Sequence, residues 1–242
     1  MNTMDKDYQK PGAELALQRL KEGNLRFISG KSEHPHTSKK RLQMAAAENQ
    51  AKFAFATVLS CSDSRVPVER IFDAGIMDLF VIRVAGNVCQ TNEIGSIEYG
   101  LCQVQTPLLV VLGHTRCGAV TAAVEATIGT SISLERNIPH LLNSLQPAVQ
   151  KSLKKNKSAS EKKLIATAIE ENIWNSIENL FLKSPATRDL VRYGHIKVIG
   201  AIYNLDTGVV TWLDEAKITE ILKKADTSMN REIDPVVLFP NS

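Results

Sequence analysis

The stretch Ser60-Cys61-Ser62-Asp63-Ser64-Arg65 decides how this sequence folds, because it places a thiol, a carboxylate and a guanidinium directly after an apolar run. That run, residues 53–59, has the composition of a buried strand. A second apolar run, residues 108–112, ends in a similar way, in Gly113-His114-Thr115-Arg116-Cys117-Gly118. Because both runs end in residue types that bind metal ions, we expect the fold to hold these two strand ends side by side.

The composition of the chain narrows the class of protein. Its 242 residues fit one domain, and the formal net charge of +3 is too small to indicate binding to nucleic acid or to a membrane surface. Four cysteines are too few for a disulfide scaffold. Residues 1–10 are polar, unlike a secretory signal, and no apolar run approaches the roughly 20 residues of a transmembrane helix. We therefore expect a cytoplasmic protein without a nucleic-acid or membrane partner.

Strand-like and helix-like segments alternate along the chain, which predicts an α/β fold. The predicted strands are residues 53–60, 78–84, 107–112, 196–203 and 209–213. The predicted helices are residues 12–30, 39–49, 67–72, 93–104, 119–128, 135–155 with an interruption near Pro147, 160–182, 185–193 and a last one from 218. Crossover helices join parallel strands, whereas Asp206-Thr207-Gly208 is typical of a hairpin turn, so only the last strand should be antiparallel.

These elements predict a mostly parallel central sheet, of order 2-1-3-4-5, flanked by helices. We expect the whole chain, 1–242, to form a single domain. Residues 1–50 would be its N-terminal helical arm, residues 51–213 its α/β core, and residues 214–242 its C-terminal helix and a tail with an apolar end.

The two strand ends predict a zinc site. Ligands gather beyond the carboxyl ends of parallel strands, so Cys61 and His114 converge if their strands are neighbours. Cys117 follows three residues after His114, in the first turn of the next helix, where backbone amides favour a thiolate. Two thiolates and one imidazole suit Zn²⁺, and three protein ligands leave a fourth position for water, as in catalytic zinc sites. We expect one Zn²⁺ per chain.

Asp63 and Arg65 decide whether that fourth position stays open. Asp63 is close enough in sequence to bind the metal itself, which would close the site. Arg65 carries a fork of N–H donors that can hold the carboxylate away. Asp63 can then accept a hydrogen bond from the zinc-bound water or hydroxide and orient it. We therefore expect Asp63 and Arg65 to act as a catalytic pair.

These residues resemble the β-class carbonic anhydrases. The motifs that carry the resemblance are Cys61–Arg65, Val66–Glu69, Asp78–Asn87, Gly95–Gly100 and Gly113–Gly118. The resemblance implies a zinc lyase that converts carbon dioxide reversibly to bicarbonate and a proton, with zinc-bound hydroxide as the attacking group. It also implies homodimers that often pair into homotetramers, in which the N-terminal helix wraps over the partner.

Three further positions are interpreted through this resemblance. Phe80 and Tyr99 match aromatic residues that line the family's substrate pocket at the dimer interface. Val58 stands where many members that close the site with the aspartate have tryptophan, so we expect the open arrangement here. Lys52 stands where plant-like members have a glutamine that donates to substrate, and Gln50 lies two residues earlier.

The residues leave other activities open. The same metal ligands could serve a hydrolase of carbon disulfide or carbonyl sulfide. A zinc module without catalytic activity would use Asp63 as a permanent fourth ligand. A cysteine hydrolase would use Cys61 or Cys117 with His114, although bound zinc would quench that nucleophile.

Overall fold

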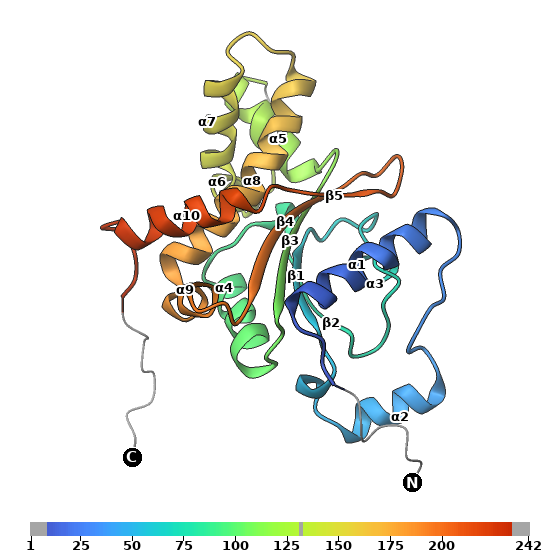
Figure 1. Ribbon diagram of the computed structural model, residues 1–242. Coiled ribbons are helices and arrows are strands. Elements are labelled where there is room, and N and C mark those ends of the chain that lie inside the picture. Colours follow the sequence, from blue (N-terminus) through green and yellow to red (C-terminus); the bar gives the residue numbers. More distant parts are fainter. Residues whose placement is uncertain (1–8, 131–132, 234–242) are drawn as a thin grey trace.

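One five-stranded sheet organises the part of the chain that the computed structural model describes, residues 9–130 and 133–233 (Figure 1). The strand order is β2-β1-β3-β4-β5, and every pair is parallel except β4 with β5. The predicted fold class and strand order are therefore confirmed. The strands are β1 (Ala56–Ser60), β2 (Leu79–Arg83), β3 (Leu108–His114), β4 (Lys197–Tyr203) and β5 (Val210–Trp212).

Helices cover both faces of the sheet. One face packs against α1 (Ala13–Ile28) and α3 (Val68–Ile71). The other face packs against α4 (Thr91–Glu98), α8 (Glu161–Lys183), α9 (Pro185–Arg192) and α10 (Ala216–Thr227).

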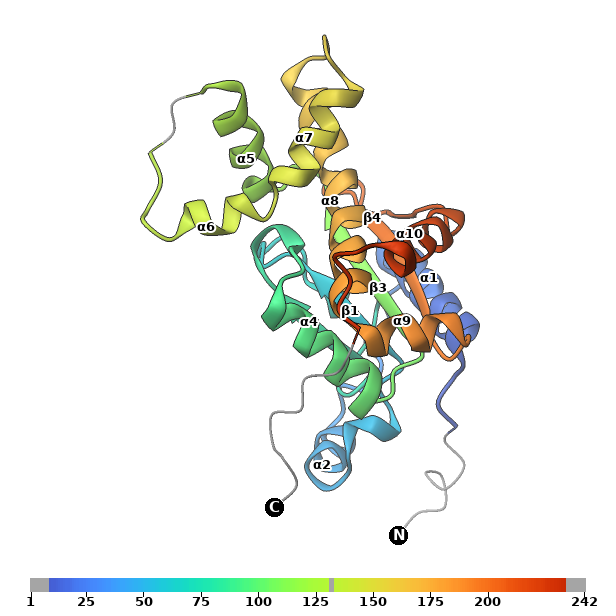
Figure 2. The same cartoon turned by 90° about the vertical axis from the view of Figure 1, so that its left-hand side faces the viewer.

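A third group of helices lies beyond the carboxyl edge of the sheet, as the turned view shows (Figure 2). It contains α5 (Gly118–Ile128), α6 (Ile138–Asn143), α7 (Gln146–Lys155) and the first half of α8. The short α2 (Lys39–Ala47) lies near the opposite edge. None of the helices within the described ranges is long and apolar enough to span a bilayer. The apolar end predicted for the tail lies outside these ranges.

The leucines of residues 12–30 predict an apolar helix face that includes Leu15 and Leu25, and the buried face of α1 differs from it. Leu15 and Leu25 are exposed, whereas Gly23 and Asn24 are buried. Asn24 donates hydrogen bonds to the carbonyl oxygens of Ile71 and Gly208, at 3.2 and 2.9 Å, and accepts one from a β5 amide. The three hydrogen bonds of Asn24 to backbone groups stabilise the fold more than the burial of one more leucine would, because unpaired buried backbone groups are costly.

The helix predicted at residues 93–104 is also interrupted. The α-helix α4 ends at Glu98, and Tyr99–Gln103 form a wider π-helical turn. The backbone amide and the hydroxyl of Thr106 both donate to the carbonyl of Gly100, each at 3.1 Å, which stabilises this turn. A third hydrogen bond, 2.6 Å between the hydroxyls of Thr106 and Thr57, connects the turn to β1.

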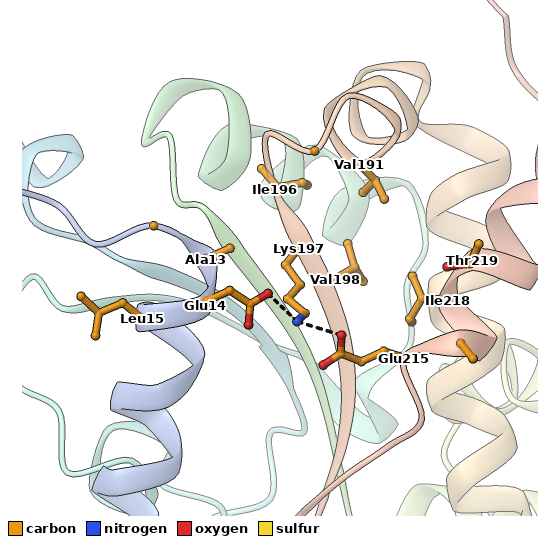
Figure 3. Close-up of a pocket in the computed structure, with 13 residues that line it drawn as sticks. Ala13, Glu14, Leu15, Val191, Ile196, Lys197, Val198, Glu215, Ile218 and Thr219 are labelled. Atoms are coloured by element: carbon orange, nitrogen blue, oxygen red, sulfur yellow. Dashed lines mark hydrogen bonds and ion pairs between the residues drawn. The ribbon is translucent and has the colours of Figure 1, made fainter.

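A groove of about 770 Å³ lies beside the first half of β4, between the start of α1 and the start of α10 (Figure 3). Lys197 lies in it between Glu14 and Glu215, with its Nζ 2.8 Å from an oxygen of each carboxylate. Lys197 is the first residue of β4, whereas His114 is level with Tyr203, the last one. The groove is therefore at the opposite end of the strand from the predicted metal site.

Gly23 lies where α1 packs directly against the backbone at the end of α3. A Cβ added there would lie 1.9 Å from the Phe72 carbonyl oxygen. We predict that Gly23→Ala lowers the free energy of unfolding by about 2–3 kcal/mol, although alanine favours helices, because α1 must move away from the sheet. Gly12→Ala, at the N-cap of the same helix with nothing within 4 Å, is the control and should cost about 0.5–1 kcal/mol. Urea unfolding measures both, and equal effects would contradict the prediction.

Candidate metal centre

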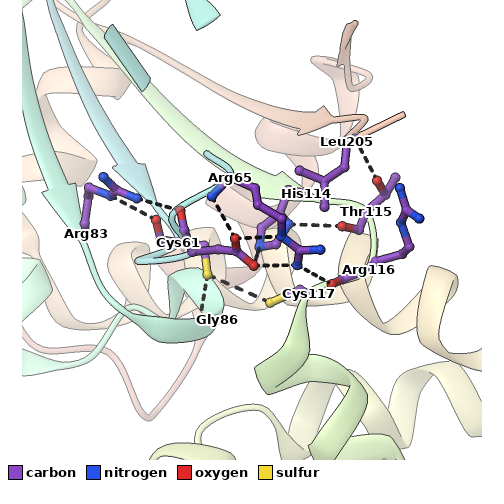
Figure 4. Close-up of polar contacts among 10 residues, drawn as sticks. Cys61, Arg65, Arg83, Gly86, His114, Thr115, Arg116, Cys117 and Leu205 are labelled. Carbon is purple, nitrogen blue, oxygen red and sulfur yellow. Dashed lines mark hydrogen bonds and ion pairs between the residues drawn. The ribbon is translucent and has the colours of Figure 1, made fainter. Parts of the chain in front are cut away.

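The pairing of β1 with β3 brings the predicted ligands together (Figure 4). Ser60 is level with Leu112, so Cys61 and His114 emerge from neighbouring strands at the same edge. Cys117 is the N-cap residue of α5, at the end of the loop that follows β3. The three ligand atoms all lie within 4.8 Å of one another, and the three residues are buried.

The geometry of this cluster fits a tetrahedral zinc ion. Zn–S bonds of about 2.3 Å place two sulfurs ~3.8 Å apart in a tetrahedral site, and the sulfurs of Cys61 and Cys117 are 4.0 Å apart. The Nδ1 of His114 lies 3.0 Å from the Thr115 carbonyl oxygen, so it carries the proton. The buried Nε2 of His114 has no hydrogen-bond partner, and its lone pair faces the sulfurs. Orientation of a histidine by a backbone carbonyl is typical of metal ligands.

The contact between the two sulfurs moves the pKa values of Cys61 and Cys117 in opposite directions. The hydrogen bond between the two sulfurs, and after it the His114 side chain and the backbone amides of Asp63 and Gly86, lowers the pKa of Cys61. The same contact with the Cys61 thiolate raises the pKa of Cys117. A divalent cation between the two sulfurs would allow both thiols to ionise.

Arg65 holds Asp63 by a bidentate ion pair. The Nε and Nη2 of Arg65 lie 2.9 and 2.6 Å from the two carboxylate oxygens, and the Arg65 backbone amide donates to the same carboxylate at 2.9 Å. These hydrogen bonds, led by that of the guanidinium, hold the pKa of Asp63 well below its usual range. The Oδ2 of Asp63 lies 4.0 Å from the Nε2 of His114. An ionised acceptor thus faces the cluster.

Arg83 also supports the site and did not stand out in the sequence. From the end of β2 it donates to the carbonyl oxygens of Cys61 and Asp63, at 3.1 and 2.7 Å. It thereby fixes the backbone of the loop that carries both side chains. The one available signal was its position as the last residue of a predicted parallel strand, at the edge where ligands gather.

Phe80 and Tyr99 contact each other but are not brought to the metal cluster of their own chain. Their rings stack with centroids 6.0 Å apart, and Tyr99 is 54% exposed. Phe80 is level with Thr57, four residues before Cys61, or about 13 Å along the strand. Within one chain the pair is therefore a surface feature at the side of the sheet.

The comparison with protein families agrees with this geometry. A family model described as carbonic anhydrase matches residues 56–210, which include every residue of the cluster. The chain belongs to the β-carbonic anhydrase family. Carbonic anhydrase 2 of Mycobacterium tuberculosis is 34% identical over 194 residues, 80% of this chain and 89% of that protein. A carbonic anhydrase of Mycolicibacterium smegmatis is 44% identical over 111 residues, 46% of this chain and 52% of that protein.

A solved structure shares the fold of this family member. A β-carbonic anhydrase of Aspergillus fumigatus superposes with a TM-score of 0.66 at 27% identity, over 88% of this chain and 96% of that one. The prediction of an enzyme that hydrates carbon dioxide reversibly is thereby confirmed at the level of the family. Neither hydrolysis of carbon disulfide or carbonyl sulfide nor a zinc module without activity is favoured by these findings.

The cluster predicts that zinc content depends on individual thiols. We expect Cys61→Ser to reduce bound zinc from one per chain to well below that, because a thiolate ligand is lost. Cys102→Ser is the matched control, since this half-buried thiol lies outside the cluster, and it should retain zinc. Elemental analysis of both purified variants measures the zinc content per chain. Full zinc content in Cys61→Ser would show that Cys61 is not a ligand.

Proposed function

We propose that Cys61, His114 and Cys117 hold one catalytic zinc ion and that Asp63 and Arg65 keep its fourth position open for the hydration of carbon dioxide. The observation that carries the proposal is the bidentate pairing of Asp63 with Arg65 beside a buried Cys-His-Cys cluster. When bound, zinc lowers the pKa of a coordinated water, to about 7 in the carbonic anhydrase that holds it by three histidines, and stabilises negative charge on a substrate oxygen.

The residues of the chain have separate roles in this proposal. Arg65 occupies both carboxylate oxygens of Asp63 and so keeps this carboxylate off the ligand cluster. Asp63 stays ionised and accepts a hydrogen bond from the attacking water, which aims the lone pair of that water at the substrate carbon. Val88 and Val120 pack with Cys61 and Cys117 in one apolar cluster, which limits the access of bulk water and suits an apolar substrate.

The function is tested by replacing Asp63. We predict that Asp63→Ala lowers turnover in stopped-flow carbon dioxide hydration by about 10²–10⁴-fold while zinc stays bound, because an oriented acceptor is lost. Arg65→Lys, which keeps the charge but not the two-point contact, should show an intermediate loss. Asp189→Ala is the control, since it removes an exposed Asp-Arg pair on α9 and should leave turnover within about twofold of the native value. Unchanged turnover in a zinc-replete Asp63→Ala would refute the role of Asp63.

We also propose that the enzyme works as a homodimer, or as a tetramer of two dimers. Tyr99 and the half-buried edge strand β2 form a surface that a second copy would cover. The register places Phe80 about 13 Å along the sheet from Cys61, and the pair would instead line the metal centre of the partner. Two β-carbonic anhydrases of Sordaria macrospora, which share this fold, are described as tetrameric.

The dimer predicts an effect of Tyr99 on both assembly and activity. Tyr99→Arg would place a charge in the apolar contact, so we expect a monomer by light scattering and an activity reduced on the order of 10-fold to 100-fold. Tyr193→Arg is the control, because Tyr193 is 69% exposed at the C-terminal end of α9, away from β2. A dimeric Tyr99→Arg with native activity would refute this interface.

A cytoplasmic location is proposed on the state of the cysteines. Cys61, Cys89, Cys102 and Cys117 are all free thiols, and thiolate ligands are kept available in a reducing compartment.

A further inference from the structure

A turn in an unusual backbone conformation contacts the proposed metal centre. In Ala85–Asn87, which follows β2, Gly86 has φ +72° and Asn87 has φ +42°. The amide of Gly86 donates to the sulfur of Cys61 at 3.3 Å. Two consecutive residues in the left-handed region are unfavourable for the chain alone, so tertiary contacts must hold them.

Helix α8 supplies two of these contacts. The Nδ2 of Asn172 donates to the carbonyl of Gly86 at 2.7 Å, and the hydroxyl of Ser176 donates to the carbonyl of Asn87 at 3.0 Å. Asn172 and Ser176 are four residues apart, on the same face of the helix, and each is 1% exposed. The turn is therefore held at two successive carbonyls from one rigid element.

The opposite side of the turn is closed by other helices. A Cβ on Gly86 would lie 3.3 Å from the Ala119 methyl group of α5 and 3.3 Å from a methyl group of Leu145. On α8, Ile173 packs so closely over Gly113, next to His114, that a Cβ there would lie 2.9 Å from its Cδ1. One stretch of α8 therefore contacts both the strand end that carries His114 and the turn that contacts Cys61.

We propose that Asn172 and Ser176 are positioning residues of the metal centre. They hold the turn so that the Gly86 amide points at the Cys61 sulfur, which fixes the direction of this ligand and withdraws charge from it. The inference rests on the proposed role of Cys61 as a zinc ligand. Residues that orient metal ligands through one intervening group commonly change metal affinity 10-fold to 100-fold when they are replaced.

A purely structural role is the alternative, because buried polar side chains often satisfy backbone carbonyls in loops. That role would change the stability of the fold but not the electronic state of the Cys61 sulfur. The cobalt-substituted protein separates the two, since the energy of its sulfur-to-cobalt charge-transfer band reports the charge on the thiolates. A thiolate that loses an N–H donor gives its electrons more easily, so the band moves to longer wavelength.

The experiment compares full-length Asn172→Ala with the native protein. We expect zinc affinity, measured by competition with a chelator, to fall about 10-fold to 100-fold, and the cobalt charge-transfer band to move to longer wavelength. Native affinity and an unmoved band in folded Asn172→Ala would overturn the proposal. Absence of zinc from the native protein would refute the proposed metal centre. Native zinc binding that Asn172→Ala leaves unchanged would refute only the positioning role of Asn172.

A matched pair of serines covers the case in which Asn172→Ala does not fold. Ser176→Ala and Ser152→Ala each remove a buried hydroxyl that donates to a backbone carbonyl. Ser152 is the control because it donates to the carbonyl of Leu164, between α7 and α8, and not to the turn at Gly86. We expect Ser176→Ala to bind zinc about tenfold more weakly, Ser176→Thr to restore the affinity, and Ser152→Ala to bind zinc as the native chain does. Equal affinities in the two alanine variants would overturn the proposal.

Discussion

The parallel pairing of β1 with both β2 and β3 is the constraint on which the site depends. It places three strand ends at one edge, and each of them contributes to the centre: Cys61 after β1, Arg83 at the end of β2, and His114 at the end of β3. Both faces of this sheet are covered by helices, so a register shift by one residue would turn the side chains of a strand toward the wrong helical layer. Hydrophobic burial of the strands therefore also fixes the relative positions of the polar groups at their ends.

The sequence was sufficient for the features that have a local signature. The apolar runs before Cys61 and His114 predicted the strands and their order, and the residue types at their ends predicted a cluster for zinc. The hairpin at Asp206–Gly208 predicted the antiparallel edge strand. Each of these inferences needs the identity of a few neighbouring residues and the rule that strand ends of a parallel sheet meet at one edge.

The features that could not be predicted depend on contacts distant in sequence. Asn172 and Gly86 are separated by 86 positions, and no periodicity or motif links an asparagine in a long helix to a turn after β2. The buried face of α1 depended on Asn24, whose partners lie in two other segments. The π-helical turn at Tyr99 depended on Thr106, beyond the end of the helix. In each case a polar side chain satisfies backbone groups that the sequence does not reveal as unsatisfied.

The third helical group would couple the binding of the proposed zinc ion to the packing of the fold. Cys61 and Cys117 belong to the same apolar cluster as α5, α6, α7 and the first half of α8, and not to the two clusters that flank the sheet. Free energy released when two thiolates bind a metal is therefore shared with the packing of that helical group. The proposed zinc ion would in this way fasten the helical group to a sheet that has its own cores on either face.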